Sequence, residues 1–429
     1  MRLRKEVVMA LEQIFECPRT LRRLHSGPLG NLLEGFCNWL LEHGFSRWTI
    51  RKHLFNVSHL NEYLGGPGSG FRESLSSRDV AGFFKAYPLV CRRREVLEGH
   101  VRRVRYSVNR FLDYLRDSGL FDPSSGQEIY QPLLDAYLKW MRYYQHASEG
   151  TLGVRCHSIT RFLKWLGPDA IPEGLSKLSS DKIEDFFISY ARSMGRSARR
   201  SMQSALRTFL RFCLHQGYIE QSLEYAVPTL RTYKLATVPH GLTDIQAQQV
   251  LRCINRNSHV GRRDYAIVLL LYTYGVRGGQ VRALRLEDIN WEQNQILFKA
   301  LKHGKDSLLP LLPEVGESLL DYLQNSRPSC SYPHVFLTCR APYHPLPNPN
   351  SLSAIVGRYI QTAGIEIPSK GAHTFRHCFA TRMLYKGHSL KAIADVLGHR
   401  HLGTTFIYTK VEFNALSQVA LEWPKEVPQ

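Results

Sequence analysis

Apolar side chains recur at intervals of three and four residues through most of the chain, a spacing that predicts amphipathic helices. One stretch of this pattern occurs twice, because residues 32–40 and 133–141 share their apolar positions and a tryptophan, 101 residues apart. Later aromatic, serine and glycine positions correspond in the same order. Such stripes are common in helical cores, so chance resemblance is the alternative. The shared order and offset instead predict two copies of one four-helix module, residues 1–125 and 126–228.

The last predicted helix of each module lies in a run of arginines. Aromatic and apolar residues alternate with these arginines, so one helix face packs while the other is available to phosphate. Few acidic residues lie among them, which favours contact with a polyanion over a merely solvated face. The arginines that we expect to contact phosphate are Arg102, Arg103 and Arg105 in the first module and Arg199, Arg200 and Arg207 in the second.

A second kind of domain follows the repeat. Residues 229–241 follow Pro228, contain Pro239 and Gly241 and show no helical period, which predicts a linker. A helix is expected to start after Thr243, a good N-cap residue. Two short apolar runs, 295–301 and 307–311, flank a basic turn and predict a β-hairpin. We therefore expect a mainly α chain that ends in an α-rich domain with a small antiparallel sheet, residues 242–415, and a tail, 416–429.

The charge of the chain points to a polyanionic partner. Lys and Arg number 56 against 37 Asp and Glu, which gives a formal net charge of +19. Nucleic acid is the leading candidate, and ribosomal RNA or an anionic membrane surface are alternatives. The longest apolar run, residues 266–276, is too short to span a bilayer. Nine scattered cysteines and a start without the features of a signal peptide predict a reduced, cytoplasmic protein.

Three segments carry polar residues that a helical core alone does not require: residues 274–280, 371–381 and 397–408. His373 and Arg376 are three residues apart and share a face if that segment is helical. The planar fork of an arginine donates two parallel hydrogen bonds to a phosphate. Arg277 and Arg376 together therefore suit a phosphodiester. This pattern predicts phosphoryl transfer without a metal or other cofactor. The i,i+4 pair of His373 and His377 lacks the glutamate expected of a zinc protease helix.

At these residues the chain resembles the tyrosine recombinase family of the Xer and phage-integrase type. The family pattern is Arg, Lys, His-x-x-Arg, Gly-His and a terminal Tyr. Arg376 is 23 residues before His399, and His399 is 9 residues before Tyr408, as in the family. The resemblance covers roughly residues 242–415 well and the helical repeat more weakly. Together with the internal repeat, it implies tandem SAM-like helical core-binding modules ahead of an α+β tyrosine-recombinase catalytic domain.

The resemblance also implies a role for each residue. Tyr408 would attack the scissile phosphate and form a 3′-phosphotyrosine with release of a 5′-hydroxyl. Lys302 would protonate the leaving oxygen, with Lys305 as the rival for that role and otherwise a DNA contact. His373 and His399 would donate hydrogen bonds to the phosphate or assist proton transfer. The DNA partners would be double-stranded recombination sites. On DNA the chain would form a tetramer, either with copies of itself or with related recombinases.

Two departures from the family pattern stand out. Gln280 occupies the position of a usual acid three residues after the first arginine, and we expect it to support the site by hydrogen bonding. The helical module is duplicated where ordinary members have one. Two rival functions remain: DNA relaxation of the type IB topoisomerase kind, and a DNA-binding accessory protein that does not cut. The apolar stripe near the chain end, between Phe413 and Trp423, predicts a short helix that docks on a neighbouring subunit or on its own domain.

Overall fold

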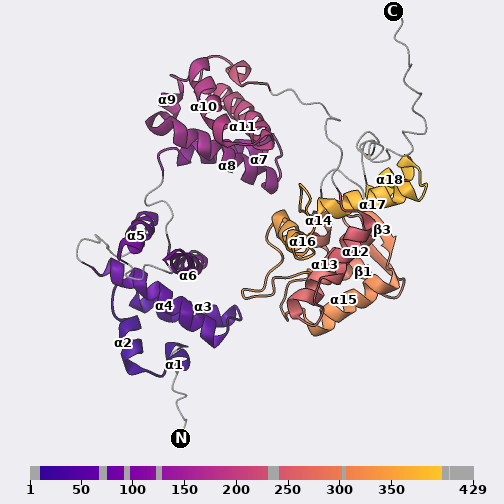
Figure 1. The fold of residues 1–429 in the computed structure, drawn as a ribbon. Helices are drawn as coiled ribbons and strands as arrows, with labels where there is room; N and C mark the ends of the chain where they lie inside the picture. The colour runs from indigo at the N-terminus through magenta and orange to yellow at the C-terminus, as the bar shows by residue number, and fades with distance from the viewer. Residues whose placement is uncertain are drawn as a thin grey trace, which may run out of the picture. The chain divides into compact units, whose positions relative to one another are not determined.

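A computed structural model describes most of the chain (Figure 1). The described residues are 10–66, 75–90, 97–121, 128–229, 241–301, 306–398 and residue 405. The chain divides into two compact units, Met1–Trp39 with Arg47–Thr232, and Leu40–Ser46 with Tyr233–Gln429.

The N-terminal part of the first unit contains the four long helices predicted for the first module, preceded by two short ones. Its core is formed by apolar faces, with fully buried rings such as Phe36, Phe83 and Phe111. Ser76 begins the third long helix by accepting a hydrogen bond from the backbone N–H of Asp79 at 3.2 Å. The helices are α1 (Ala10–Ile14), α2 (Pro18–His25), α3 (Gly30–Glu42), α4 (Arg47–Leu64), α5 (Ser77–Val90) and α6 (Leu97–Asp117).

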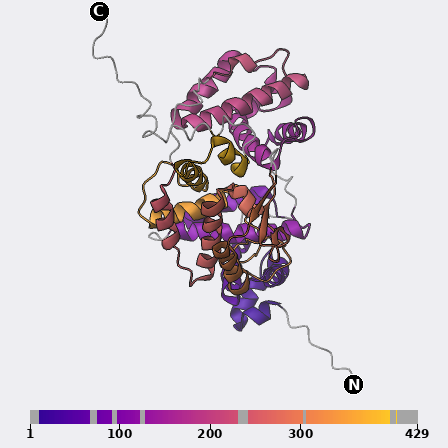
Figure 2. The same ribbon diagram turned by 90° about the vertical axis from the view of Figure 1, so that its right-hand side faces the viewer.

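The next part of the unit, drawn in magenta in Figures 1 and 2, repeats this order of helices. Its own apolar cluster includes Tyr137, Phe162 and Phe209. Ser179 caps the third long helix by accepting from the backbone N–H of Lys182. The elements are α7 (Gln131–Tyr144), α8 (Glu149–Leu166), η1 (Gly167–Asp169), α9 (Pro172–Leu175), α10 (Ser180–Ser193), α11 (Arg196–His215) and η2 (Glu224–Ala226).

Aromatic contacts correspond between these two parts. Phe36 and Phe111 lie 5.1 Å apart at an interplanar angle of 75°, and the corresponding Tyr137 and Phe209 lie 5.3 Å apart at 83°. The ring of Tyr63 meets Phe83 at 5.6 Å and 61°, and Trp165 meets Phe186 at 5.5 Å and 62°. Positions matched by sequence therefore make the same contacts in three dimensions.

The second unit is mainly helical and contains a three-stranded antiparallel sheet in the order β1-β2-β3. The predicted hairpin is confirmed, because Ile296 pairs with Leu309 across β2 and β3. Strand β1 has only two residues and was not expected from the pattern. The elements are α12 (Asp244–Arg252), α13 (His259–Tyr274), α14 (Gly278–Ala283), η3 (Leu286–Asp288), β1 (Ile289–Asn290), β2 (Gln295–Phe298), β3 (Ser307–Pro310), α15 (Pro313–Asn325), α16 (Pro349–Thr362), α17 (His373–Tyr385) and α18 (Leu390–Leu397).

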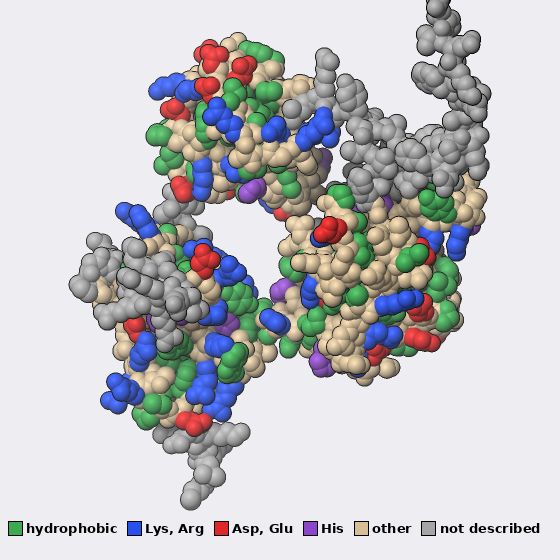
Figure 3. Space-filling view, in the orientation of Figure 1, with side chains coloured by type: hydrophobic (Ala, Val, Ile, Leu, Met, Phe, Trp, Pro, Cys, Tyr) green, Lys and Arg blue, Asp and Glu red, His purple; other side chains and the backbone are tan. Residues whose placement is uncertain are grey.

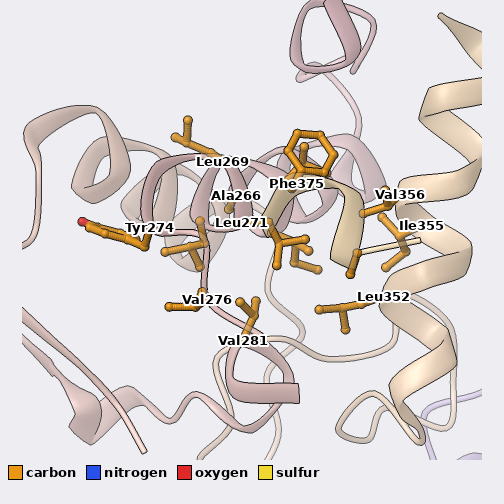
Figure 4. Close-up of a cluster of buried hydrophobic side chains, with 14 of the residues drawn as sticks. Ala266, Leu269, Leu271, Tyr274, Val276, Val281, Leu352, Ile355, Val356 and Phe375 are labelled. Atoms are coloured by element: carbon orange, nitrogen blue, oxygen red, sulfur yellow. The ribbon is translucent and has the colours of Figure 1, made fainter. Parts of the chain in front are cut away.

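Helix α13 forms the centre of this unit. Its consecutive residues from Ala266 to Leu271 are buried, so the helix is covered by protein on nearly every side. Figure 4 shows Ala266, Leu269 and Leu271 of α13 in one cluster with Phe375 of α17 and Leu352 of α16. The core thereby fixes α17, whose first residues belong to the predicted site. Within the part of the chain described here, no helix is long and apolar enough to cross a membrane.

Candidate active site

Arg277 is positioned by the sharp end of α13. The helix ends at Gly275, which has a φ of 61° and a backbone N–H that donates to the Leu271 carbonyl. A Cβ at this position would lie 2.6 Å from the Phe379 ring, so both the backbone conformation and the space require glycine. Two residues later the half-buried Arg277 takes the N-cap position of α14. The turn between the two helices therefore places this arginine at the start of α14.

Arg376 is buried, with 4% of its surface exposed, on the first turn of α17. Its Nη1 donates to the Gly275 carbonyl at 2.9 Å, and its Nη2 donates to the Leu397 carbonyl at 2.6 Å. The first carbonyl lies at the end of α13 and the second at the end of α18. A single guanidinium group therefore ties together three helices that are far apart in the sequence.

The two arginines meet at the end of α18. Arg277 Nη2 donates to the carbonyl of Gly398 at 3.2 Å, next to the carbonyl that Arg376 holds. Gly398 has a φ of 62° and caps α18. Because the free carbonyls at a helix C-terminus carry partial negative charge, they stabilise nearby cations. The structure thus brings Arg277 and Arg376 together, as the sequence predicted.

His373, the first residue of α17, lies near both arginines. Its pKa is lowered from the ordinary histidine value, first by desolvation among the surrounding protein atoms and then by the positive charges of Arg376 and Arg277. His377, one turn further on, has its pKa lowered to about 4, chiefly by burial. The two imidazole centres are 6.4 Å apart. Both histidines are therefore neutral at neutral pH.

Gln280 connects the turn around Arg277, between α13 and α14, to the sheet. Its Oε1 accepts from the backbone N–H of Arg277 at 3.1 Å. Its Nε2 lies 3.5 Å from the carbonyls of Phe298 and Lys299, at the end of β2. A carboxylate at this position accepts hydrogen bonds only, whereas the amide also donates to the strand. Hydrogen bonding by Gln280 was expected, and the structure adds its partners.

The hairpin that leads to the predicted lysines is held at its base. The backbone N–H of Ala300, two residues after β2, donates at 2.7 Å to Oδ1 of Asp306, the residue before β3. Lys299 forms an ion pair with Asp288 at 2.6 Å, and its pKa is raised mainly by that hydrogen bond. The candidate residues Lys302, Lys305, His399 and Tyr408 lie outside the described residues, as does the predicted tail helix.

A network that the sequence did not reveal anchors α17 at its other end. Arg382 forms an ion pair with Asp244 at 3.2 Å and donates to the Tyr272 carbonyl at 2.9 Å. Its guanidinium carbon lies 4.2 Å from the centre of the Tyr272 ring. Tyr272 and Gln248 also donate to the Asp244 carboxylate. Asp244 is the first residue of α12, so this network joins α12 and α13 to the helix that carries Arg376.

The arginines predicted to contact phosphate differ in their surroundings. Arg102, Arg103 and Arg105 are exposed on α6, and Arg200 is exposed on α11. Arg199 instead donates to the carbonyls of Ala191 and Met194, at the end of α10. Arg207 donates to the Val227 carbonyl at 2.8 Å and to the Thr229 hydroxyl at 2.7 Å. These last two arginines hold their own module together.

Comparison with known proteins extends this picture beyond the described residues. The model of the phage integrase family matches residues 241–415. A putative integrase/recombinase of Sinorhizobium fredii is 31% identical over 95% of this chain and 97% of that protein. A tyrosine recombinase XerA of Pyrococcus furiosus is 29% identical over 63% of this chain and 87% of its own length. The solved structure of lambda integrase residues 75–356 bound to DNA aligns with a TM-score of 0.50 at 16% identity, over 70% of this chain and all of that one.

The last of these likenesses shows the fold, mainly helical with a small antiparallel sheet in the catalytic region. The sequence relatives define the class, enzymes that break and rejoin DNA. Within that class the chain belongs to the phage integrase family of tyrosine recombinases, and it is a site-specific integrase/recombinase.

Proposed function

We propose that this chain cleaves DNA by attack of Tyr408 on a phosphate held between Arg277 and Arg376. The observation that carries the proposal is the meeting of both guanidinium groups at the end of α18. The chain passes from there directly into the segment that contains His399 and Tyr408. Two arginine forks match the two nonbridging oxygens of a phosphodiester and stabilise the charge that develops on them.

The remaining residues assist the proton transfers. A neutral His373 offers one donor and one acceptor nitrogen, and its lowered pKa keeps it in that form at neutral pH. It therefore serves as a hydrogen-bond donor to phosphate or as an acceptor of the tyrosine proton. Lys302 donates a proton to the leaving 5′-oxygen, with Lys305 as its rival, and His399 donates to the phosphate. The products are a 3′-phosphotyrosine and a 5′-hydroxyl, which conserve the bond for rejoining without a nucleotide cofactor or a metal.

The helical part of the chain consists of two SAM-like modules that arose from one. Matching helix order and matching ring geometries at Phe36 and Tyr137 support this interpretation. We place the first module at residues 1–125, the second, a core-binding module, at 126–228, a linker at 229–241 and the catalytic domain at 242–415. Exposed Arg102, Arg103 and Arg105 support DNA contact by the first module.

The partners follow from the reaction and from the relatives. A lambda integrase dimer has been solved bound to a core site, which supports double-stranded recombination sites as the substrate here. Exchange of strands between two duplexes requires cleavage of four strands in total. We therefore propose a tetramer on DNA, formed by this chain alone or with related recombinases, that serves a phage or another mobile element.

A nicked suicide duplex tests the chemistry. Its short fragment diffuses away after cleavage, so the protein stays attached to DNA and migrates as an adduct in a denaturing gel. Tyr408→Phe should lose the adduct and keep DNA binding, because it removes only the nucleophilic oxygen. Tyr385→Phe is the matched control, since Tyr385 is an exposed tyrosine at the end of α17. An adduct formed by Tyr408→Phe at the normal rate would disprove the assignment.

A further inference from the structure

Three large aromatic side chains are exposed on helices α4 and α6 of the first module. Trp48 is 65% exposed, Phe55 50% and Tyr106 51%. Large apolar side chains that gather on an exposed surface often mark an interaction site. Figure 3 shows hydrophobic and basic side chains interspersed over the surface of this module.

A cation accompanies each of the three rings. Lys52 Nζ lies 3.2 Å from the centre of the Trp48 ring. The guanidinium carbon of Arg23 lies 5.5 Å from the Phe55 ring, and that of Arg110 lies 5.5 Å from the Tyr106 ring. Arg102 and Arg103 are exposed one turn before Tyr106 on α6. Arg23 and Arg110 also form ion pairs with Glu62 and Asp113, so the positive charge of this surface comes mainly from Lys52, Arg102 and Arg103.

The three rings lie on two helices that pack against each other. Trp48, Lys52 and Phe55 follow one another at i, i+4 and i+7 on α4, so they form a single stripe. Helix α4 packs along α6, and the His53 ring lies 5.6 Å from the Tyr106 ring. We call this surface, formed by Trp48, Lys52, Phe55, Arg103 and Tyr106, the aromatic face.

The second module does not repeat the aromatic face. In the first module the rings of His53 and Tyr106 join α4 to α6. The corresponding residues of the second module are Arg155 and Ser204, and Arg155 donates a hydrogen bond to the Ser204 hydroxyl at 2.8 Å. The two modules carry similar apolar residues at their buried positions, but the second module has no tryptophan, phenylalanine or tyrosine at the positions of the three exposed rings. The residues that correspond to Trp48, Phe55 and Tyr106 are Gly150, His157 and Ser204.

The chemistry of this face fits unpaired nucleic-acid bases. A base stacks on an aromatic ring through its π face, and the adjoining Lys or Arg meets its phosphate. The acids nearby are already paired, Glu62 with Arg23 and Asp113 with Arg110. A second copy of this chain is a poor occupant, because the chain carries a net charge of +19. Duplex DNA offers phosphates but keeps its bases stacked on each other.

We propose that the aromatic face of the first module binds unpaired bases of single-stranded DNA. Lys52 covers one side of the Trp48 ring, and a base stacks on the other. Such a site would hold a displaced strand during cleavage and exchange. The inference rests on the proposed contact of the first module with DNA and adds the form of DNA that it binds.

The test measures binding of the full chain to a fluorescein-labelled oligothymidylate by fluorescence anisotropy. Trp48→Leu and Tyr106→Leu keep an apolar side chain but remove the ring, and each should weaken binding about tenfold. Their salt dependence should stay unchanged, whereas Lys52→Ala should reduce the slope of log affinity against log salt by about 0.7. Tyr143→Leu is the control, because Tyr143 is 64% exposed on α7 of the second module. Thermal melting checks that each variant is folded.

Three results would overturn the proposal. Oligothymidylate affinity that is unchanged in both ring variants shows that these rings do not stack on bases. A loss restricted to duplex binding shows that the face reads paired DNA. A change in sedimentation without any change in DNA binding shows that it is a protein interface. Adduct formation on the suicide duplex is scored separately, so a failure here does not touch the proposed cleavage mechanism.

Discussion

Replacement of Arg382 by methionine tests how strongly helix α17, which carries the proposed site residues His373 and Arg376, depends on its anchor. Methionine keeps much of the apolar packing of the side chain but loses every polar contact. The side chain of Arg382 is 20% exposed and that of Asp244 is 42% exposed, so their ion pair is screened and contributes about 0.5 kcal/mol. The hydrogen bond to the Tyr272 carbonyl contributes about 1.5 kcal/mol, and stacking on the Tyr272 ring about 0.5–1 kcal/mol.

These contributions add up to about 3 kcal/mol of unfolding free energy. Their loss should lower the melting temperature of the catalytic domain, measured in the full chain, by roughly 6–12 °C. Cleavage of the suicide duplex should slow even below that temperature, because α17 carries Arg376. Asp244→Asn removes the charge but keeps an acceptor, so its effect should stay below about 1 kcal/mol. Arg252→Met, at an exposed position on α12, is the control. A melting temperature for Arg382→Met within 1 °C of the parent would refute this account of the anchor.

Four further outcomes are expected. Arg277→Ala or Arg376→Ala should each slow adduct formation by about 10²–10³ or more, and a smaller loss in single-turnover assays would argue against direct phosphate contact. Cleavage should persist in EDTA, so that a metal requirement would contradict the proposed site. Deletion of residues 1–125 should shorten the nuclease footprint, and an unchanged footprint would assign the first module to protein contacts. Truncation after Asn414 should abolish synapsis but spare monomer melting and single-site binding if the tail docks on a neighbour; a lower melting temperature would place it in its own core.

Local sequence patterns predicted the helices and the turn around Arg277 well. The apolar run that ends in Gly275 forms α13 with its left-handed cap, and His-x-x-Arg begins α17. Both features depend on residues close in sequence, where helical spacing and glycine conformation decide the outcome. The Thr243 cap was predicted for the same reason, and the structure shows it as a full capping box with Gln246.

Long-range contacts could not be predicted in this way. Asp244 and Arg382 are 138 residues apart, and no periodic feature of the sequence connects them. The sequence likewise treats all arginines of α11 alike, whereas Arg199 and Arg207 hydrogen-bond to carbonyls of their own module. An arginine is available to DNA only if its guanidinium group is not already bound to a carbonyl of the protein. That depends on where other backbone segments end in the folded chain, which the sequence pattern does not give.

The hydrogen-bond partners of Arg277 and Arg376 explain how the fold would prepare the proposed site for an anion. Gly275, Leu397 and Gly398 offer carbonyl oxygens at the ends of α13 and α18, where helical hydrogen bonding leaves acceptors unused. A carbonyl orients a guanidinium group and carries only a partial negative charge, so most of the positive charge remains to attract phosphate. A carboxylate at the same place would orient the arginine equally well but would neutralise it. Helix ends therefore position Arg277 and Arg376 while preserving the positive charge that the proposed phosphate contact requires.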